Sequence, residues 1–422
     1  MKTILKACCN ALNRIVQALL RFGKNAVALL KPAPGWSGLK RWLLQVVTLV
    51  SFVGLGAFLV VTLGLAPIRA SSGHWPITSW FLHFAMTRSV ATQSMMIEVP
   101  ALDDPSMVIK GATHYDSGCF PCHGNPSLHE PRIALKMTPN PPYLPPVIHK
   151  WDSQELFYIV KHGVKFTGMP AWPSQQRDDE VWAMVAFLQK FPELSEHEYD
   201  RMVNGDDTRQ ESQSSDVKAD VKDADNVPLQ GLGGRKGFAQ SIINSCGRCH
   251  GKEGQGREAG VAPKLAGQQS QYLEKALVAF TRGERHSGIM EPISAGLSTD
   301  EIHEVTGYYS EREAPQQVTH NTASELAISR GAKIALEGLP KLRIPICAEC
   351  HGPGDHLRNS AYPELAGQYA DYLVQQLELF ASDHRGGSEY GSLMHPVAER
   401  LSPEQMRDVA MYYETLAAPL TR

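Results

Sequence analysis

The chain has 422 residues, of which 43% are hydrophobic, so it is long enough for two to four folded domains. Its formal net charge of −3 gives no sign of a nucleic-acid partner. Six of its eight cysteines lie in three short motifs and the other two are Cys8 and Cys9. This distribution leaves no cysteine in the body of the chain for a disulfide outside the motifs.

The basic charge is concentrated at the N-terminal end. Residues 1–97 contain ten Lys or Arg and no Asp or Glu, whereas residues 98–422 contain 31 basic and 44 acidic residues. Apolar residues recur near helical spacing over 1–31, with basic residues between them. We interpret residues 1–40 as a basic amphipathic segment on the cytoplasmic face of a membrane. A poorly ordered basic tail is the alternative.

A long uncharged stretch follows. Trp42–Ala66 carries no charge over 25 positions, and a helix of this length spans roughly 37 Å, enough for a hydrocarbon core of roughly 30 Å. We therefore predict a transmembrane helix over 41–67. A cleaved signal peptide is the alternative, although about 40 residues precede the stretch and a signal-peptide core is shorter. The excess of basic residues before it places the N-terminus in the cytoplasm and everything after 67 in the bacterial periplasm.

The segment after the predicted span is rich in aromatic residues. Trp75, Trp80, Phe81 and Phe84 lie close together in it. Aromatic side chains are enriched where a membrane meets water. Residues 68–100 are therefore predicted to hold a short periplasmic helix at the membrane interface.

Three copies of the pattern C-x-x-C-H carry the chemistry of the chain. This pattern attaches c-type haem, because two thiols at this spacing can form thioethers to one porphyrin while the adjacent His ligates its iron. A zinc site would need a second pair of ligands, and none accompanies any copy. We predict three covalently bound haem c groups. The predicted attachment cysteines are Cys119, Cys122, Cys246, Cys249, Cys347 and Cys350, and the predicted iron ligands are His123, His250 and His351.

The three motifs divide the periplasmic part into units. We predict a first haem domain over 101–195, an acidic flexible linker over 196–230, and two further haem domains over 231–318 and 319–422. No segment of these domains alternates like a strand, so the predicted fold class is all-α. Domains of about 90 residues are too small for a large apolar core, and a covalently held porphyrin would supply the missing part.

The last two domains are an internal repeat. Pro263-Lys-Leu-Ala-Gly-Gln268 corresponds to Pro363-Glu-Leu-Ala-Gly-Gln368. Further along, Leu297-Ser-Thr-Asp-Glu and Leu401-Ser-Pro-Glu-Gln each contain the signature of a helix N-cap. The first domain follows the same plan in different residues.

Each haem domain also contains a methionine suited to be the second iron ligand. Met opposite His is the ligation of electron-transfer cytochromes and raises the reduction potential. Met169, Met290 and Met394 each lie between two predicted helices, in a segment that we expect to be a loop. In the first domain Met137 is a rival, and we prefer Met169 because it lies between the last two helices.

These residues resemble a known family. The C-x-x-C-H start, the distal Met and the aromatic terminal helix are similar to class I c-type cytochromes. Residues 231–422 resemble the tandem dihaem cytochromes of the c-four type, and residues 101–195 resemble a single-haem class I domain. The resemblance implies helical domains around haem and, in the last two, a packed pair. The predicted membrane anchor and the extra haem domain depart from the c-four type, because a soluble dihaem carrier would lack both.

The predicted function is electron transfer in a respiratory chain. We expect a carrier anchored in the bacterial inner membrane, acting between a quinol-oxidising complex or periplasmic dehydrogenase and a terminal oxidase. A fixed cytochrome subunit of an oxidase or dehydrogenase is the alternative. A haem enzyme acting on peroxide, nitrite or sulfur compounds would need an open iron position, and three methionine ligands argue against one.

Overall fold

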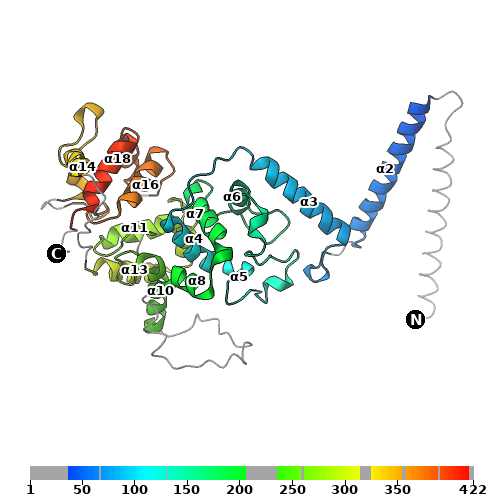
Figure 1. Ribbon diagram of the computed structural model, residues 1–422, viewed down its shortest axis with the longest axis horizontal. Helices are drawn as coiled ribbons and strands as arrows, with labels where there is room; N and C mark the ends of the chain where they lie inside the picture. The colour runs from blue at the N-terminus through cyan, green and yellow to red at the C-terminus, as the bar shows by residue number, and fades with distance from the viewer. Residues whose placement is uncertain are drawn as a thin grey trace. The chain divides into compact units, whose positions relative to one another are not determined.

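The computed structural model describes residues 37–65, 68–129, 131–205, 235–257, 261–313, 325–353, 358–387 and 390–417. Within these ranges the regular elements are helices, and the single β-bridge joins Leu339 to Ile344 (Figure 1). The prediction of an all-α protein is confirmed. The amphipathic segment predicted at 1–40 lies outside the described residues, except for its last four positions. The chain divides into two units, residues 1–72 and 73–422.

The first unit contains one long apolar helix. Helix α2 (Gly38–Thr62) is 25 residues long, its most apolar window has a mean hydropathy of 2.3, and none of that window is buried. Its length and composition are sufficient to cross a membrane. The helix begins before and ends sooner than the predicted 41–67. It ends because Gly64 adopts a left-handed conformation with φ of +68°.

The second unit begins with the helix predicted after the span. Helix α3 (Pro76–Gln93) starts with Pro at its first position, where the missing N–H costs nothing. Trp75, Trp80, Phe81 and Phe84 are all more than half exposed. This exposure agrees with an interfacial helix, and its location at a membrane stays a prediction.

Domain 1 (residues 101–205) is built around two crossing helices. Helices α4 (Pro105–Gly118) and α7 (Asp178–Lys190) approach so closely that a Cβ on Gly111 would lie 2.3 Å from the Ala183 carbonyl oxygen. The shorter helices of this domain are α5 (Phe120–His123), α6 (Ser153–His162) and α8 (Glu196–Asn204). The centre of α7 is buried over nine consecutive residues, so this helix forms the core of the domain.

Helix α8 corrects the predicted linker. Residues 196–204 were expected to be flexible because they are acidic, but Ser195 and Glu198 form a capping box that starts a helix there. Tyr199 and Val203 are one turn apart and buried, and the Tyr199 hydroxyl donates a hydrogen bond to Asp116 at 2.8 Å. The acidic residues lie on the other side of this amphipathic helix. The rest of the predicted linker lies outside the described residues.

Domains 2 (residues 235–313) and 3 (residues 325–417) repeat one helical plan. Helices α11 (Ser270–Thr281), α12 (Met290–Ala295) and α13 (Thr299–Ser310) correspond to α16 (Ala370–Ala381), α17 (Gly391–Ala398) and α18 (Pro403–Glu414). Before them stand α10 (Arg235–His250) in domain 2, and α14 (Glu325–Glu337) and α15 (Ala348–His351) in domain 3. Ser298 and Ser402 form the predicted N-terminal capping boxes.

The repeated Pro-x-Leu-Ala-Gly-Gln segments join domains 2 and 3 to each other. The Gln268 amide donates to the Glu364 carbonyl at 2.6 Å and accepts from the Glu364 N–H at 3.1 Å. Gln368 makes the matching pair with the backbone of Lys264, both at 3.0 Å. Each buried glutamine therefore satisfies two backbone groups of the other domain, and the repeat in sequence becomes a reciprocal contact.

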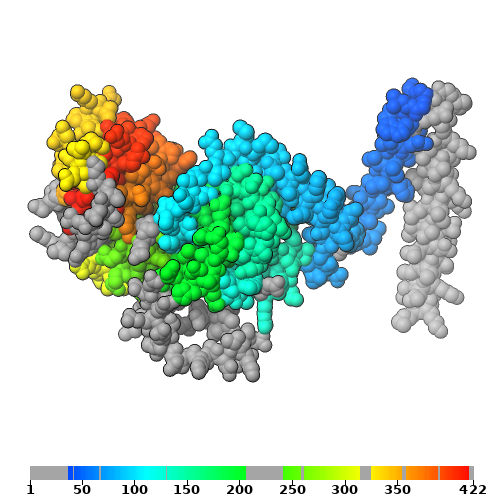
Figure 2. Space-filling model, viewed as in Figure 1, coloured from blue at the N-terminus to red at the C-terminus, as the bar shows by residue number. Residues whose placement is uncertain are grey.

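Domain 1 also packs against domain 2. Figure 2 shows the cyan-to-green atoms of domain 1 adjoining the green-to-yellow atoms of domain 2. Arg177 donates a hydrogen bond to the His286 carbonyl at 2.9 Å, and Asp116 forms an ion pair with Arg248. Domain 1 is thus held on domain 2 by specific polar contacts.

Replacing Gln268 with Ala tests the reciprocal contact. The change leaves the buried N–H and C=O of Glu364 without partners, so we expect the free energy of unfolding to fall by about 2 kcal/mol. Chemical denaturation of the full chain, followed by circular dichroism, measures this. The neighbouring Gln269 is exposed, and Gln269→Ala should change stability far less. Equal losses in the two variants would contradict the assigned contact.

Candidate haem-binding sites

Each C-x-x-C-H motif forms the end of a helix. The motifs lie on α5, on the last turn of α10 and on α15. The first cysteine of each motif packs against the apolar core of its own domain. Among the second cysteines, Cys350 is exposed and the other two are partly buried. Burial raises the pKa of Cys119 to about 12 and the pKa values of Cys246 and Cys347 to about 11. The six thiols stand one helical turn apart in pairs, as attachment to one porphyrin requires.

The motif histidines share one hydrogen bond. Nδ1 of His123, His250 and His351 lies 2.8, 2.7 and 2.9 Å from the carbonyl oxygens of Pro142, Pro263 and Pro363. A carbonyl only accepts, so Nδ1 carries the proton and Nε2 keeps its lone pair. Burial lowers the pKa of all three imidazoles and favours the neutral form. Each ring is thereby prepared to bind a metal ion through Nε2.

Pro142 was missed by sequence reasoning. Its segment, Pro142-Tyr-Leu144, matches Pro263-Lys-Leu265 and Pro363-Glu-Leu365, and this short Pro-x-Leu pattern was the available signal. The separation from the histidine is 19 residues in domain 1, against 13 and 12 in domains 2 and 3. The longer loop concealed the correspondence.

A glycine follows each motif histidine and turns the chain away. Gly124, Gly251 and Gly352 have φ values of +73°, +78° and +76°, a conformation that other residues rarely adopt. Tyr115 donates to the Gly124 carbonyl and Tyr413 to the Gly352 carbonyl, each at 2.8 Å. Tyr115 lies on α4, the first helix of domain 1, and Tyr413 on α18, the last helix of domain 3. Equivalent glycine carbonyls in the two domains are therefore bonded by tyrosines from different helices.

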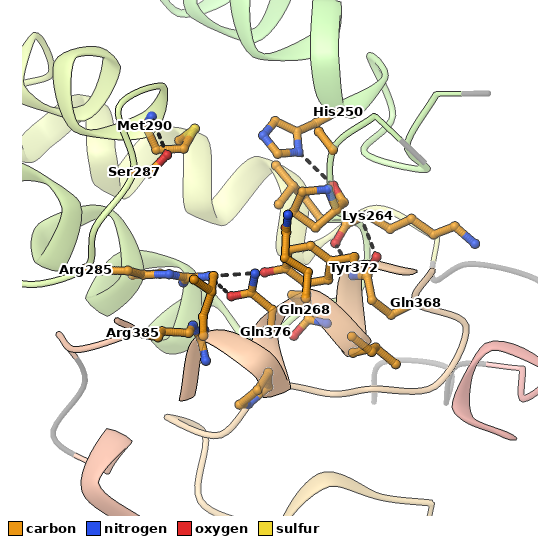
Figure 3. Close-up of a pocket in the computed structure, with 18 of the residues that line it drawn as sticks. His250, Lys264, Gln268, Arg285, Ser287, Met290, Gln368, Tyr372, Gln376 and Arg385 are labelled. Atoms are coloured by element: carbon orange, nitrogen blue, oxygen red, sulfur yellow. Dashed lines mark hydrogen bonds between the residues drawn. The ribbon is translucent and has the colours of Figure 1, made fainter. Parts of the chain in front are cut away.

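A large cavity extends through domains 2 and 3 and also reaches domain 1, where Arg177 and Glu180 line it. Its volume is about 1300 Å³, and it is lined mostly by apolar side chains. His250, Met290, His351 and Met394 all line it, together with the four cysteines of the two motifs. Figure 3 shows His250 and Met290 at this cavity. The residues predicted from sequence to hold two haem groups are thus brought together around a space suited to a large apolar ligand.

Two partly buried arginines face this cavity. Arg285 donates to the Tyr372 hydroxyl at 3.1 Å (Figure 3). Arg385 donates to the Tyr272 hydroxyl at 3.4 Å. Their guanidinium groups lie over the rings of Phe280 and Phe380. In the described part of the chain neither has a carboxylate partner, and the buried Nε of Arg385 has no hydrogen-bond partner. Burial, reinforced by the neighbouring Arg285, lowers the pKa of Arg385.

Paired cations in an apolar cavity fit the carboxylates that a haem carries. Arginine binds carboxylates with charge-assisted hydrogen bonds, and haem brings two propionates on one edge. The unpartnered Arg385 Nε is therefore the kind of polar atom that bound haem would satisfy. Sequence reasoning missed both arginines, although Phe280-x₄-Arg285 and Phe380-x₄-Arg385 repeat at identical spacing.

The three predicted methionine ligands occupy different local structures. Met169 lies in a loop, as expected, but Met290 is the first residue of α12 and Met394 lies within α17. The prediction of a loop is wrong for these two, because short helices form between the longer ones. All three side chains are partly buried. In domain 1, a Cβ on Gly168 would lie 2.1 Å from Met137 Cε, so the rival Met137 lies beside the Met169 loop.

Comparisons with known proteins agree with this arrangement. Residues 107–188 match the family described as cytochrome c oxidase, cbb3-type, subunit III, and residues 234–311 and 329–417 each match the cytochrome c family. A thiosulfate dehydrogenase electron acceptor from Stutzerimonas stutzeri (strain A1501) is 35% identical, over 44% of this chain and 88% of that protein. One of the same description from Thiomonas intermedia (strain K12) is 34% identical, over 40% and 76%. Cytochrome c4 from Thiocapsa roseopersicina is 33% identical, over 41% and 87%.

Two equivalent tyrosines provide a test of the glycine carbonyl contact. Tyr413→Phe leaves the buried Gly352 carbonyl unsatisfied, and we expect it to lower the free energy of unfolding by about 1 kcal/mol. Tyr309 is the corresponding residue of domain 2, and its buried hydroxyl has no hydrogen-bond partner. Tyr309→Phe should therefore be closer to neutral in the same denaturation experiment. The reverse order of the two losses would contradict the contact.

Proposed function

Because the chain belongs to the class I c-type cytochromes, with a c4-like pair of domains at its C-terminal end, we propose that it is a membrane-anchored carrier with three haem c groups. In this proposal it accepts electrons from a periplasmic dehydrogenase and passes them towards a terminal oxidase. The observation that carries the proposal is the His–Pro hydrogen bond, which recurs at all three motifs. One donor is suggested by two relatives that are named thiosulfate dehydrogenase electron acceptors.

Each haem c would be held by one motif and one methionine. The two cysteines of a motif would form the thioethers, and its histidine would bind the iron. Met169, Met290 and Met394 would supply the second ligand in domains 1, 2 and 3. Bound haem c supplies a one-electron Fe(III)/Fe(II) couple, and a thioether ligand opposite histidine raises its potential. The proline carbonyls hold the proton on Nδ1 of each motif histidine. The apolar lining of the cavity would exclude water, and Arg285 and Arg385 would neutralise the negative charge of haem propionates there.

Full ligation favours a carrier over an enzyme. A haem enzyme needs one iron with an open or displaceable position, and each domain offers a methionine for that position. The matched relatives are named as cytochromes or electron acceptors. The proposal therefore includes no substrate chemistry at the three sites.

The anchor and the location follow from the N-terminal part. Helix α2 is long and apolar enough to span a membrane, and the basic residues before it place the N-terminus in the cytoplasm. The haem domains would then lie in the periplasm, beside the inner membrane. Exposed aromatic residues of α3 support contact with the membrane surface.

A specific observation favours a second candidate. Domain 1 matches the family of cbb3-type oxidase subunit III over 107–188. A fixed subunit of an oxidase would also carry an anchor and haem domains. In that case, mild detergent extraction from native membranes would yield the chain in constant proportion with oxidase subunits, whereas a free carrier would be purified without them.

Haem content and methionine replacement test the ligand set. The mass of the intact protein should exceed that of the polypeptide by three covalent haem groups. Met169→Leu, Met290→Leu and Met394→Leu should each remove about one third of the Met–iron charge-transfer absorbance. Met137→Leu is the matched control and should leave the absorbance unchanged. If Met137→Leu removes the signal and Met169→Leu does not, the ligand of domain 1 is reassigned.

Reduction by a candidate donor tests the function. Oxidised full-length protein in detergent is mixed with a thiosulfate dehydrogenase and thiosulfate, and reduction is followed in the visible spectrum. We expect all haem to be reduced rapidly with both components present and only slowly when either is omitted. Reduction by thiosulfate alone would indicate that the chain is itself the oxidising enzyme. No reduction with both present would exclude this donor.

A further inference from the structure

A buried carboxylate of domain 1 reaches the segment that precedes Met290 in domain 2. Glu180, on α7, is only 3% exposed. Its Oε1 accepts a hydrogen bond from the Ser287 hydroxyl and its Oε2 accepts one from the Gly288 N–H, both at 2.6 Å. Ser287 and Gly288 are themselves buried. A charged group in this position is costly unless it is fully bonded, so the contact is a specific feature of the interface.

Domain 1 also holds Glu180 from its own side. Arg177 lies 3.0 Å from its Oε1, and the Trp172 indole N–H donates to its Oε2 at 3.3 Å. Burial raises the pKa of the Glu180 carboxyl and the adjacent Arg177 guanidinium opposes that rise. Arg177 further donates to the His286 carbonyl across the interface. The position of the carboxylate is therefore fixed independently of Ser287.

Ser287 connects this carboxylate to Met290. Its hydroxyl oxygen accepts the Met290 N–H at 3.0 Å, and its backbone carbonyl accepts the Glu291 N–H at 3.0 Å. A serine hydroxyl can donate only one hydrogen bond, and Ser287 donates it to Glu180. The oxygen lone pairs are thereby left directed to the backbone at Met290, where α12 begins.

We propose that Glu180 is a positioning residue for Met290, so that domain 1 fixes the methionine ligand of the haem in domain 2. The proposal rests on the proposed function, in which Met290 binds that iron. In this proposal the contact between domains 1 and 2 helps to build the second haem site and does not merely join two haem domains.

Close packing at the same point supports the proposal. A Cβ on Gly288 would lie 2.0 Å from the Trp172 indole nitrogen, so only glycine allows this approach. Trp172 stands three residues after Met169, and Gly288 two residues before Met290. The methionine segments of domains 1 and 2 are therefore in direct contact.

Domain 3 provides an internal comparison. The residue three positions before Met394 is Gly391, which has no hydroxyl to accept or donate. Gly391 is buried, as Ser287 is, but the next two residues differ: Ser392 and Leu393 are exposed, whereas their counterparts Gly288 and Ile289 are buried and partly buried. The proposed positioning is thus specific to one of the two repeats, and Met394 serves as a reference within the same molecule.

The test uses the full-length protein with its haem groups and three variants. Glu180→Gln removes the charge and places an amide NH2 against one of the two donors, the Ser287 hydroxyl or the Gly288 N–H, and Ser287→Ala removes the hydroxyl. Asp116→Asn is the control for the Met methyl signals alone, because it weakens the Arg248 ion pair elsewhere in the same interface. Arg248 lies between the two cysteines of the second motif, so the midpoint potentials of this variant are not used as a control. The measurements are the Met methyl resonances in paramagnetic NMR, the Met–iron absorbance and the midpoint potentials.

We expect Glu180→Gln and Ser287→Ala to shift one Met methyl signal and one of the three potentials, assigned to domain 2 by comparison with Met290→Leu. The Met methyl signals of Met169 and Met394, and all Met methyl signals in Asp116→Asn, should stay in place. Unchanged signals in Ser287→Ala, or an equal shift of the Met290 methyl signal in Asp116→Asn, would overturn the proposal. If Met290→Leu itself leaves the Met–iron absorbance intact, the ligand assignment in the proposed function fails instead.

Discussion

The hydrogen bond from each motif histidine to a proline carbonyl constrains the structure around it. For this bond to form, the chain must turn sharply after the histidine and return across the imidazole within 12 to 19 residues. The positive φ of the glycine after the histidine makes the turn, and a buried tyrosine holds the glycine carbonyl in domains 1 and 3. The other helices of each domain then pack around the side of the histidine that faces away from the proline. One backbone acceptor thus determines both the ligand state of the histidine and the course of the loop.

Local and repeated features were the ones that sequence could predict. The motifs, the capping boxes at Ser298 and Ser402 and the all-helical class follow from spacing within a few residues. Composition misled at 196–204, because acidic residues concealed the two apolar positions by which α8 packs. Length misled at Pro142, since its loop is longer than the two that resemble each other.

Contacts between distant segments could not be predicted, because no local pattern encodes them. Glu180 reads in sequence as one of three consecutive acidic residues at the start of a helix, an ordinary surface arrangement. Only the fold brings it into contact with partners that lie 107 and 108 positions away in the sequence, in a buried interface between two domains. Arg285 and Arg385 are a similar case. In sequence each is an ordinary basic residue of a loop, and only the fold brings it to a tyrosine of the other repeat.

The two halves of the duplicated module present different surfaces to their surroundings. Domain 1 covers the approach to Met290, whereas Ser392 and Leu393 leave the approach to Met394 open to solvent. A soluble protein that recognises this region of one repeat can therefore reach it only on domain 3. Two domains that repeat one helical plan therefore differ in exposure: the segment before Met290 is covered by domain 1, and the segment before Met394 is exposed.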